Sequence, residues 1–370
     1  MVSSPAPAPP LRPLEAGHDS VEVIDQTQLP HEVRRVRLTS CEDVARAIET
    51  MTVRGAPLIG VSAAYGLWLA MREDPSDAGL AAAHARLLRT RPTAVNLSWA
   101  LDRVRTEVLT ASPGDRAVLA RGCADAILEE DVALCAAIGE HGLPLLEKVF
   151  HSRGEQRPVN VLTHCNAGWL ATIEWGTALA PVYKAHQKGL PIHVYVDETR
   201  PRNQGASLTA WELGQRGIAH TVIADNAGGH LMQRGLVDVC LVGSDRTTAR
   251  GDVCNKIGTY LKALAARAHD VPFYVGLPGP TIDWTITDGL ASILIEERDG
   301  DEVRRVWGRD EAGNRSAVSI VPREVPVANP AFDVTPAALV SALITERGVC
   351  PATAVGLASL YPERAPRSAL

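Results

Sequence analysis

Five short apolar stretches in the second half of the chain decide its fold: VNVLTHC (residues 159–165), IHVYVDE (192–198), HTVIADN (220–226), VDVCLVGSD (237–245) and PFYVGLP (272–278). Each has the length and the β-branched content of a strand, and segments with helical spacing separate them. Strands that are buried on both faces and joined by short crossover helices run parallel. The pattern therefore predicts a Rossmann-like, doubly wound parallel sheet.

The first half of the chain has a different pattern. From Thr39 to about Phe150 it is rich in Ala and Leu at spacings of three and four, which is typical of amphipathic helices. Ser40 followed by Asp43 predicts a capped helix start, and Gly139 and Gly142 lie where a long helix is expected to end. The predicted fold class is α/β, with a mostly helical N-terminal domain and a Rossmann-like domain.

The boundary between the domains is predicted at HSRGEQRP (151–158), which is polar and contains Gly and Pro. We assign residues 21–150 to the mostly helical domain and 151–360 to the Rossmann-like catalytic domain. Residues 1–20 are rich in Pro, Ala and Ser without an apolar signal core, so a flexible tail is expected there, and residues 361–370 are expected to be loose. Near the end, a helix is predicted to begin at Thr335 and Pro336.

Composition excludes several classes of function. The 370 residues are 46% apolar and 22% charged, as in an ordinary globular protein, and the net charge of −6 provides no basic field for nucleic acid or an anionic membrane. The longest apolar stretch, residues 58–71, is too short to span a membrane. Seven cysteines without a CxxC pair and eleven histidines without ligand spacing predict reduced thiols and no required metal. We expect a cytoplasmic protein without a cofactor.

Polar side chains follow the predicted strands, at the sheet edge where ligands bind in this fold. Cys165 comes just before an expected helix, whose N-terminus would favour a thiolate, although a free cysteine is also commonly a buried structural residue. Asp245 ends another strand, where burial would raise its pKa and suit it to proton donation, and a helix cap is the equal alternative. Asp197 and Asp225 have the same ambiguity, and at least one of them is expected to be structural.

Phosphate-binding groups occur without a nucleotide-binding motif, because the sequence has no Walker A pattern and no GxGxxG after the first strand of the sheet. Asn255 and Lys256 are predicted at the start of a helix, where backbone N–H groups and a lysine hold phosphate together. Arg54 in VRGAP and Arg91 in TRPTAVN precede predicted helices and could bind phosphate through two guanidinium hydrogen bonds. Each is also compatible with an ordinary solvated charge.

Several longer blocks resemble the methylthioribose-1-phosphate isomerase family, in the order in which that family has them. These blocks are VRGAPLIGVSAAYGL, RPTAVNLSWALDR, LTHCNAGWLAT, DETRPRNQGASLTAWEL, VGSDRTTARGDVCNKIGTY and NPAFDVTP, and the resemblance extends over roughly residues 20–350. The family is related to regulatory subunits of a translation-initiation exchange factor and to ribose 1,5-bisphosphate isomerase.

The resemblance implies an aldose–ketose isomerase that converts 5-methylthioribose 1-phosphate to 5-methylthioribulose 1-phosphate in methionine salvage. It implies a homodimer, Cys165 as the catalytic thiol and Asp245 as the proton donor. It also implies substrate binding by Arg54, Gly55, Ala56, Arg91, Gln204, Asn255 and Lys256.

The anomeric phosphate of such a substrate prevents simple opening of the sugar ring, so a protonated Asp245 would assist ring opening at the ring oxygen. Hydrogen must then move from C2 to C1. Either Cys165 removes the C2 proton to give an enediol, or hydride shifts directly while Cys165 handles the O2 proton or stabilises charge. The sequence leaves both routes open.

Three departures from the family pattern concern the 5-substituent of the sugar: Trp169 after CNAG, Ser244 before Asp245, and DNAGGH at 225–230. Trp169 would narrow the pocket in favour of a 5-deoxy sugar, stack on the methylthio sulfur, or pack in the core. Isomerisation of 5-deoxyribose 1-phosphate or ribose 1,5-bisphosphate is therefore an alternative function. A non-enzymatic regulatory subunit is the alternative of another class, and the presence of both Cys165 and Asp245 disfavours it.

Overall fold

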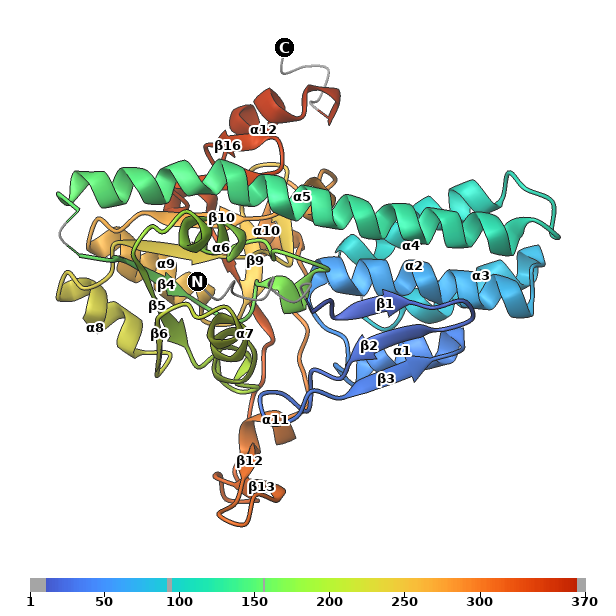
Figure 1. Cartoon of the computed structure of the whole chain (residues 1–370), viewed down its shortest axis with the longest axis horizontal. Coiled ribbons are helices and arrows are strands. Elements are labelled where there is room, and N and C mark those ends of the chain that lie inside the picture. Colours follow the sequence, from blue (N-terminus) through green and yellow to red (C-terminus); the bar gives the residue numbers. More distant parts are fainter. Residues whose placement is uncertain (1–10, 92–94, 156, 365–370) are drawn as a thin grey trace, which may run out of the picture.

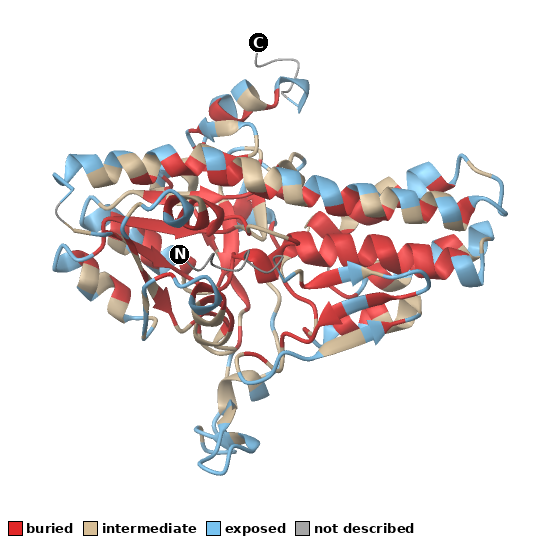
Figure 2. Cartoon of the chain, in the orientation of Figure 1, coloured by how far each residue is buried: buried red, intermediate tan, exposed pale blue. Residues whose placement is uncertain are grey.

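The structure is a computed structural model that describes residues 11–91, 95–155 and 157–364. Two regions lie side by side, and the long helix α5 (Arg116–Ser152) runs along both of them (Figure 1). Buried residues fill the interior of each region, and exposed residues mark the outer turns of α5 (Figure 2). Among the described residues, no helix has the length and apolar character needed to cross a membrane.

The N-terminal region combines a small antiparallel sheet with a helical layer. The sheet has the order β1 (Leu14–Ala16), β2 (Val21–Ile24), β3 (Arg35–Leu38). The helices are α1 (Cys41–Glu49), α2 (Ala56–Glu73), α3 (Asp77–Leu88), α4 (Val95–Val108) and the first half of α5. Ser40 and Asp43 form the predicted capping box of α1. Helix α2 is buried along almost its whole length, between α4 and α5.

The predicted tail at residues 1–20 is wrong for its described part, because Leu14 is fully buried and β1 pairs with β2. Residues 1–10 lie outside the described residues. At the other end, the prediction of a loose segment is wrong for Tyr361, which is buried and stacks edge-on against Trp284. Apolar side chains decide both cases, since burying them outweighs the disorder that neighbouring Pro, Ala and Ser favour.

The prediction that α5 ends near Gly139 and Gly142 is also wrong, because the helix continues to Ser152. A side-chain carbon on Gly142 would lie 2.3 Å from Pro181, and one on Gly139 would lie 3.2 Å from the carbonyl oxygen of Ala180. The two glycines therefore allow α5 to pack closely on α6 (Ala180–Gln187). Because α5 crosses the segment predicted as the boundary, the division into domains at residue 150 stays a prediction.

The C-terminal region contains the predicted sheet. Its seven strands have the order β16 (Gly348–Cys350), β15 (Ala342–Thr345), β10 (Phe273–Gly276), β7 (Val239–Val242), β4 (Val159–Thr163), β5 (Ile192–Asp197), β6 (His220–Ile223). Every pairing is parallel except that of β15 with β16. The strand order reverses between β4 and β7, and such a reversal creates a crevice at the carboxyl edge of the sheet.

Helices cover both faces of this sheet, which confirms the doubly wound fold. One face packs on α5, α6 and α7 (Ala210–Gln215), which follows a π-helical turn at Gly205–Thr209. The other packs on α8 (Ala227–Gln233), α9 (Thr259–Ala268) and α12 (Ala354–Leu360). Alternate strand residues enter the two cores, as Val161 and Leu162 do in β4.

The segment after β10 differs from its prediction. No helix begins at Thr335 and Pro336: Thr335 ends strand β14 (Phe332–Thr335), a 3-10 turn covers Ala337–Leu339, and β15 follows. Strand β14 belongs to a second sheet of the order β11 (Ile282–Asp283), β8 (Arg246–Thr248), β9 (Val253–Lys256), β14. The hairpin of β12 (Arg305–Arg309) and β13 (Arg315–Ser319) projects from the body, next to the short helix α11 (Asp301–Arg304) (Figure 1). A one-turn helix α10 (Gly289–Ser292) and 3-10 turns at Trp169–Ala171, Gly279–Thr281 and Pro362–Arg364 complete the described elements.

Candidate active site

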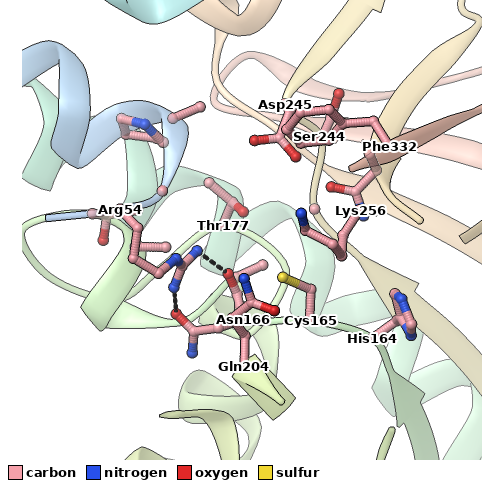
Figure 3. Close-up of a pocket in the computed structure, with 18 of the residues that line it drawn as sticks. Arg54, His164, Cys165, Asn166, Thr177, Gln204, Ser244, Asp245, Lys256 and Phe332 are labelled. Atoms are coloured by element: carbon pink, nitrogen blue, oxygen red, sulfur yellow. Dashed lines mark hydrogen bonds between the residues drawn. The ribbon is translucent and has the colours of Figure 1, made fainter. Parts of the chain in front are cut away.

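A cavity lies at the carboxyl ends of β4 and β7, where the strand order reverses. Figure 3 shows the thiol of Cys165, the ammonium of Lys256, and the side chains of Arg54 and Asp245 around it. The structure brings all nine predicted site residues to this one cavity: Arg54, Gly55, Ala56, Arg91, Cys165, Gln204, Asp245, Asn255 and Lys256. A neighbouring cavity of about 450 Å³ shares Met51, Arg54 and Gln204 with it and lies beside the β12–β13 hairpin.

Cys165 lies two residues beyond the end of β4 and has a left-handed backbone, with φ of 62°. Its N–H donates to Thr199 Oγ1 at 2.8 Å, and its carbonyl oxygen accepts from Thr209 Oγ1 at 2.6 Å. These two hydrogen bonds fix the backbone in a conformation that L-residues rarely adopt.

The thiol of Cys165 is not activated as the sequence predicts. The next helical element is a single 3-10 turn, Trp169–Ala171, so the expected helix dipole is not what acts on the sulfur. Burial raises the pKa of Cys165, while the charges of Arg54 and Lys256 lower it in part. The group is a thiol at neutral pH, with two cations placed to stabilise a thiolate once it forms.

Asp245 agrees with its sequence-based interpretation as an acid at the mouth of a strand. Burial raises the pKa of its carboxyl group, although Lys256, Arg91 and Arg54 act in the opposite direction. Its backbone N–H donates to the carbonyl oxygen of Cys254 at 2.9 Å, which fixes it against β9. The geometry leaves the carboxyl group facing the cavity as a potential proton donor.

Arg54 precedes α2, as predicted, and its guanidinium is buried. It donates to the carbonyl oxygen of Asn166 at 2.8 Å and also to Asn166 Oδ1. Gly55 follows with φ of 95°, and a side-chain carbon there would lie 2.5 Å from the carbonyl oxygen of Ala171. Only glycine fits this approach, so the start of α2 lies directly against the loop that follows β4.

Three other predicted binding residues are buried at the cavity wall. Arg91 lies 3.6 Å from the carboxylate of Glu296, and burial lowers its pKa. The Gln204 Oε1 atom is buried and has no hydrogen-bond partner among the described residues. Lys256 donates to the carbonyl oxygen of Ala331 at 2.9 Å, and burial lowers the pKa of its ammonium. A buried cation and an unpaired amide oxygen are groups that a polar ligand would satisfy.

The prediction that Asn255 and Lys256 begin a helix is wrong, because both lie in strand β9 and α9 begins only at Thr259. Their pairing with Phe332 and Asp333 on β14 fixes them as strand residues. Asn255 Nδ2 instead donates to Thr259 Oγ1 at 3.0 Å. These two residues therefore do not combine with the N–H groups of a helix N-terminus to bind phosphate in the way that the sequence predicts.

Sequence reasoning missed further lining residues, among them Met51, Thr177 and Phe332. Phe332 lies under the ammonium of Lys256, which is 4.5 Å from the ring centroid. The block NPAFDVTP contains Phe332 and carries the only sequence signal for it. Trp169 packs on Trp211 with ring centroids 5.7 Å apart, which agrees with the packing alternative for this residue.

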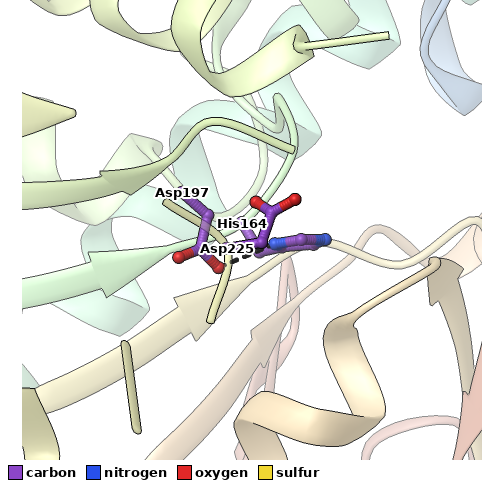
Figure 4. Close-up of side chains that lie close together, drawn as sticks. All are labelled: His164, Asp197 and Asp225. Carbon is purple, nitrogen blue, oxygen red and sulfur yellow. Dashed lines mark hydrogen bonds and ion pairs between the residues drawn. The ribbon is translucent and has the colours of Figure 1, made fainter. Parts of the chain in front are cut away.

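A second polar cluster, shown in Figure 4, joins His164, which also lines the cavity, to Asp197 and Asp225, with ligand atoms within 4.8 Å of one another. His164 Nδ1 lies 2.8 Å from Asp197 Oδ2, and the ammonium of Lys262 lies 3.1 Å from the same oxygen. Asp225 accepts the backbone N–H groups of Thr199 and Arg200. These contacts give Asp197 and Asp225 structural roles, and the lysine supplies the positive charge that a metal would bring.

The fold and the cavity define an α/β protein with a thiol, an acid and several buried cations at the switch point of a Rossmann-type sheet. Residues 52–352 match the initiation factor 2 subunit family. The chain is 64% identical to methylthioribose-1-phosphate isomerase of Rhodospirillum rubrum, over 94% of this chain and 90% of that protein. It is 40% identical to the crystal structure of 5-methylthioribose 1-phosphate isomerase from Pyrococcus horikoshii, with a TM-score of 0.80 over 95% of this chain and 96% of that one.

A further solved relative, translation initiation factor eIF-2B subunit delta from A. fulgidus, is 39% identical with a TM-score of 0.77, over 95% of this chain and all of that one. The chain belongs to the methylthioribose-1-phosphate isomerase family, within the initiation factor 2 subunit family. The predicted family and the prediction of an enzyme are thereby confirmed. The homodimer and the cytoplasmic location stay predictions.

Proposed function

We propose that this chain converts 5-methylthioribose 1-phosphate to 5-methylthioribulose 1-phosphate, as a step of methionine salvage. The observation that carries the proposal is the convergence of Cys165 and Asp245 on one cavity together with Arg54, Arg91 and Lys256. The identity of 64% with a protein named for this reaction supports the choice of substrate. Three buried cations suit a substrate with one phosphate dianion, and Met51 and Phe332 offer apolar surface for a thioether.

In the first step, Asp245 donates its proton to the ring oxygen as the bond between C1 and that oxygen breaks. Burial raises the pKa of Asp245, which favours the protonated form that this step uses. The positive charge that develops at C1 is shared with the oxygen that bears the phosphate. The substrate is held by the backbone at Gly55 and Ala56 and by the side chains of Arg54, Arg91, Gln204, Asn255 and Lys256.

Before the second step, the thiol of Cys165 releases its proton to solvent. The resulting thiolate then accepts a proton from the substrate, and two routes balance. In the hydride route, hydrogen moves from C2 to C1 with its electron pair, and Cys165 accepts the proton of O2. In the enediol route, the sulfur accepts the C2 proton and returns it to C1, while the O2 proton goes to the carboxylate of Asp245. Lys256 and Arg54 stabilise the thiolate that either route requires.

The test is conversion of the purified wild-type chain with 5-methylthioribose 1-phosphate, followed by NMR in metal-free buffer. Ribose 1,5-bisphosphate and 5-deoxyribose 1-phosphate serve as competing substrates. Preferred turnover of the methylthio sugar supports the proposal, whereas preference for another sugar phosphate reassigns the substrate. No turnover of any of them by folded protein would overturn the proposed reaction.

The same reaction in D2O separates the two routes. Deuterium at C1 of the product indicates the enediol route, because the sulfur exchanges its proton with solvent. Protium at C1 indicates the hydride route, because hydrogen then never leaves the carbon skeleton.

A further inference from the structure

A buried carboxyl group lies beneath the loop that carries Cys165, outside the cavity itself. Glu212 on α7 is fully buried. Its Oε2 accepts the backbone N–H of Leu170 at 3.1 Å, and its Oε1 accepts the hydroxyl of Tyr183 at 2.9 Å. A side-chain carbon on Gly168 would lie 1.3 Å from Oε1, so the loop needs glycine in order to approach this carboxyl.

Glu212 is connected to Arg54 through Asn166. The guanidinium of Arg54 donates to both oxygens of Asn166, one on the side chain and one on the backbone. The Asn166 amide donates to Thr209 Oγ1 at 3.1 Å, one turn before Glu212. The Asn166 side chain also lies close enough to the Glu212 carboxyl to lower the pKa of that group. Arg54, Asn166 and Glu212 thus form one continuous polar chain from the cavity into the core.

We propose that Glu212 is a positioning residue that acts through Asn166, and that its ionised form orients the guanidinium of Arg54 toward the phosphate of the substrate. The inference rests on the proposed function only for the identity of the substrate. An ionised carboxyl accepts hydrogen bonds from Asn166, Leu170 and Tyr183 together. A protonated carboxyl donates to the Tyr183 hydroxyl instead and is a weaker acceptor of the other hydrogen bonds, which loosens the loop and the amide that holds Arg54.

Glu212 is expected to change its protonation state close to neutral pH. Burial raises its pKa to about 7, and the hydrogen bonds from Leu170, Tyr183 and Asn166, with the charge of Arg54, keep it from rising further. The charged and titratable groups around it are Tyr183 on α6, Arg54 before α2, and Arg216, which lies over the Tyr183 ring. The orienting form is the ionised one, so substrate binding should strengthen as the pH rises through about 7.

A second buried carboxyl group, which contacts the same loop from α5, provides a matched control. Asp131 on α5 is also buried, accepts the backbone N–H of Ile173 at 2.8 Å, and has a pKa raised by burial to about 7. Asp131 contacts Cys135 rather than Asn166. A variant at this position therefore changes a buried carboxyl of the same pKa under the same loop without touching the chain to Arg54.

The test compares wild type, Glu212→Gln, Tyr183→Phe and Asp131→Asn across pH 5.5–8.5. Gln retains the shape and can still accept from Leu170 while it donates to Tyr183, so the variant removes mainly the charge. We expect KM for the sugar phosphate to rise about ten-fold in Glu212→Gln at pH 8, with kcat changed less than about three-fold. The rise of kcat/KM with pH near pH 7, which is this limb of the pH profile, should vanish in Glu212→Gln and remain in Asp131→Asn.

Tyr183→Phe keeps the proposal testable if Glu212→Gln does not fold. Loss of the hydroxyl donor raises the pKa of Glu212, so the limb of kcat/KM should move to higher pH. A phosphate ester titrates near pH 6, which adds a second limb that every variant shares. Retention of the limb near pH 7 in Glu212→Gln, or its loss in Asp131→Asn, would overturn the proposal, as would an unmoved limb in Tyr183→Phe.

Binding of inorganic phosphate, measured by calorimetry, requires no turnover and separates this proposal from the proposed function. Weaker phosphate binding to Glu212→Gln than to wild type at pH 8 supports the positioning role even if the sugar substrate is reassigned. Equal binding to the two proteins counts against it, whatever the substrate is.

Discussion

The loops that leave β4 and β7 meet at the same cavity, but the structure holds them differently. Behind β4, the backbone of Cys165 is fixed by Thr199 and Thr209, and further contacts to Arg54 and Glu212 follow within five residues. Behind β7, Ser244 and Asp245 are held locally, by Thr247 and by the carbonyl oxygen of Cys254. The first loop is joined to four residues distant in sequence, and the second is joined to its own neighbours.

This difference separates two ways of preparing a reactive group. The β4 loop fixes the position of the sulfur through the backbone and leaves the thiol itself protonated. The β7 loop prepares the acid through burial, which raises the pKa of Asp245. Disturbing the packing of the first loop should change geometry and stability, whereas replacing either reactive side chain, Cys165 or Asp245, should change the chemistry.

Asp245→Asn should show the largest effect, because it removes the transferable proton and nearly preserves the shape. We expect kcat to fall about 10³-fold or more, with KM changed little, as for the loss of a general acid. Steady-state kinetics and a thermal melt of the same preparation check this. An activity loss below ten-fold with an intact melt would remove Asp245 from the proton-donor role.

Cys165→Ser is expected to lower kcat by about 10²–10³-fold, since a serine hydroxyl ionises far less readily than a thiol to the anion that accepts the substrate proton. The hydrogen bonds to Thr199 and Thr209 involve only the backbone of Cys165, so the fold should be retained. The measurement is kcat together with the crystal structure of the variant. Near-normal turnover would show that the thiol is a packing residue, which is the other interpretation of a buried cysteine.

The sheet was predictable because continuous apolar runs such as VNVLTHC have few other interpretations. Strand β15 was not, because the Ala- and Leu-containing sequence before and within it suits a helix equally well and pairing with β10 decides its structure. Gly139 and Gly142 gave a wrong prediction of the end of α5 for a related reason, since a glycine allows close packing of helices as well as marking the end of one.

The residues of the candidate site likewise fall into those that the sequence predicts and those that only the structure reveals. Cys165, Asp245 and the basic residues stand at strand ends or before helices, where position along the chain already suggests exposure to a ligand. Glu212 and Asp131 stand inside helical sequence and resemble solvated acids, although both are buried. Their partners, Leu170 and Ile173, are 42 residues away in sequence in each case, so only the tertiary structure shows what they do.

Gly168→Ala tests whether the β4 loop is as closely packed as its hydrogen bonds indicate. The added carbon would meet the Glu212 carboxyl, so we expect a loss of about 3 kcal/mol in the free energy of unfolding. Gly189→Ala is the control: it has φ of 77° and open space around it, so backbone strain alone should cost about 1 kcal/mol. Urea denaturation of both variants measures the difference, and equal losses would mean that the loop yields easily.

Asp131→Asn tests the same loop through the pH dependence of stability. The carboxyl has a pKa of about 7 in the folded protein, against about 3.9 when unfolded, so the folded state holds its proton more tightly. Its contribution to stability is complete below about pH 4 and is lost as the pH rises through about 7. The free energy of unfolding of wild type relative to Asp131→Asn should therefore fall by about 1.4 kcal/mol per pH unit between about pH 4.5 and 7 and then level off. Denaturation curves at pH 5, 6, 7 and 8 measure this slope. A difference that does not change with pH would mean that Asp131 ionises as freely as in water, and the β4 loop would then be held by its hydrogen bonds without any help from a buried neutral acid.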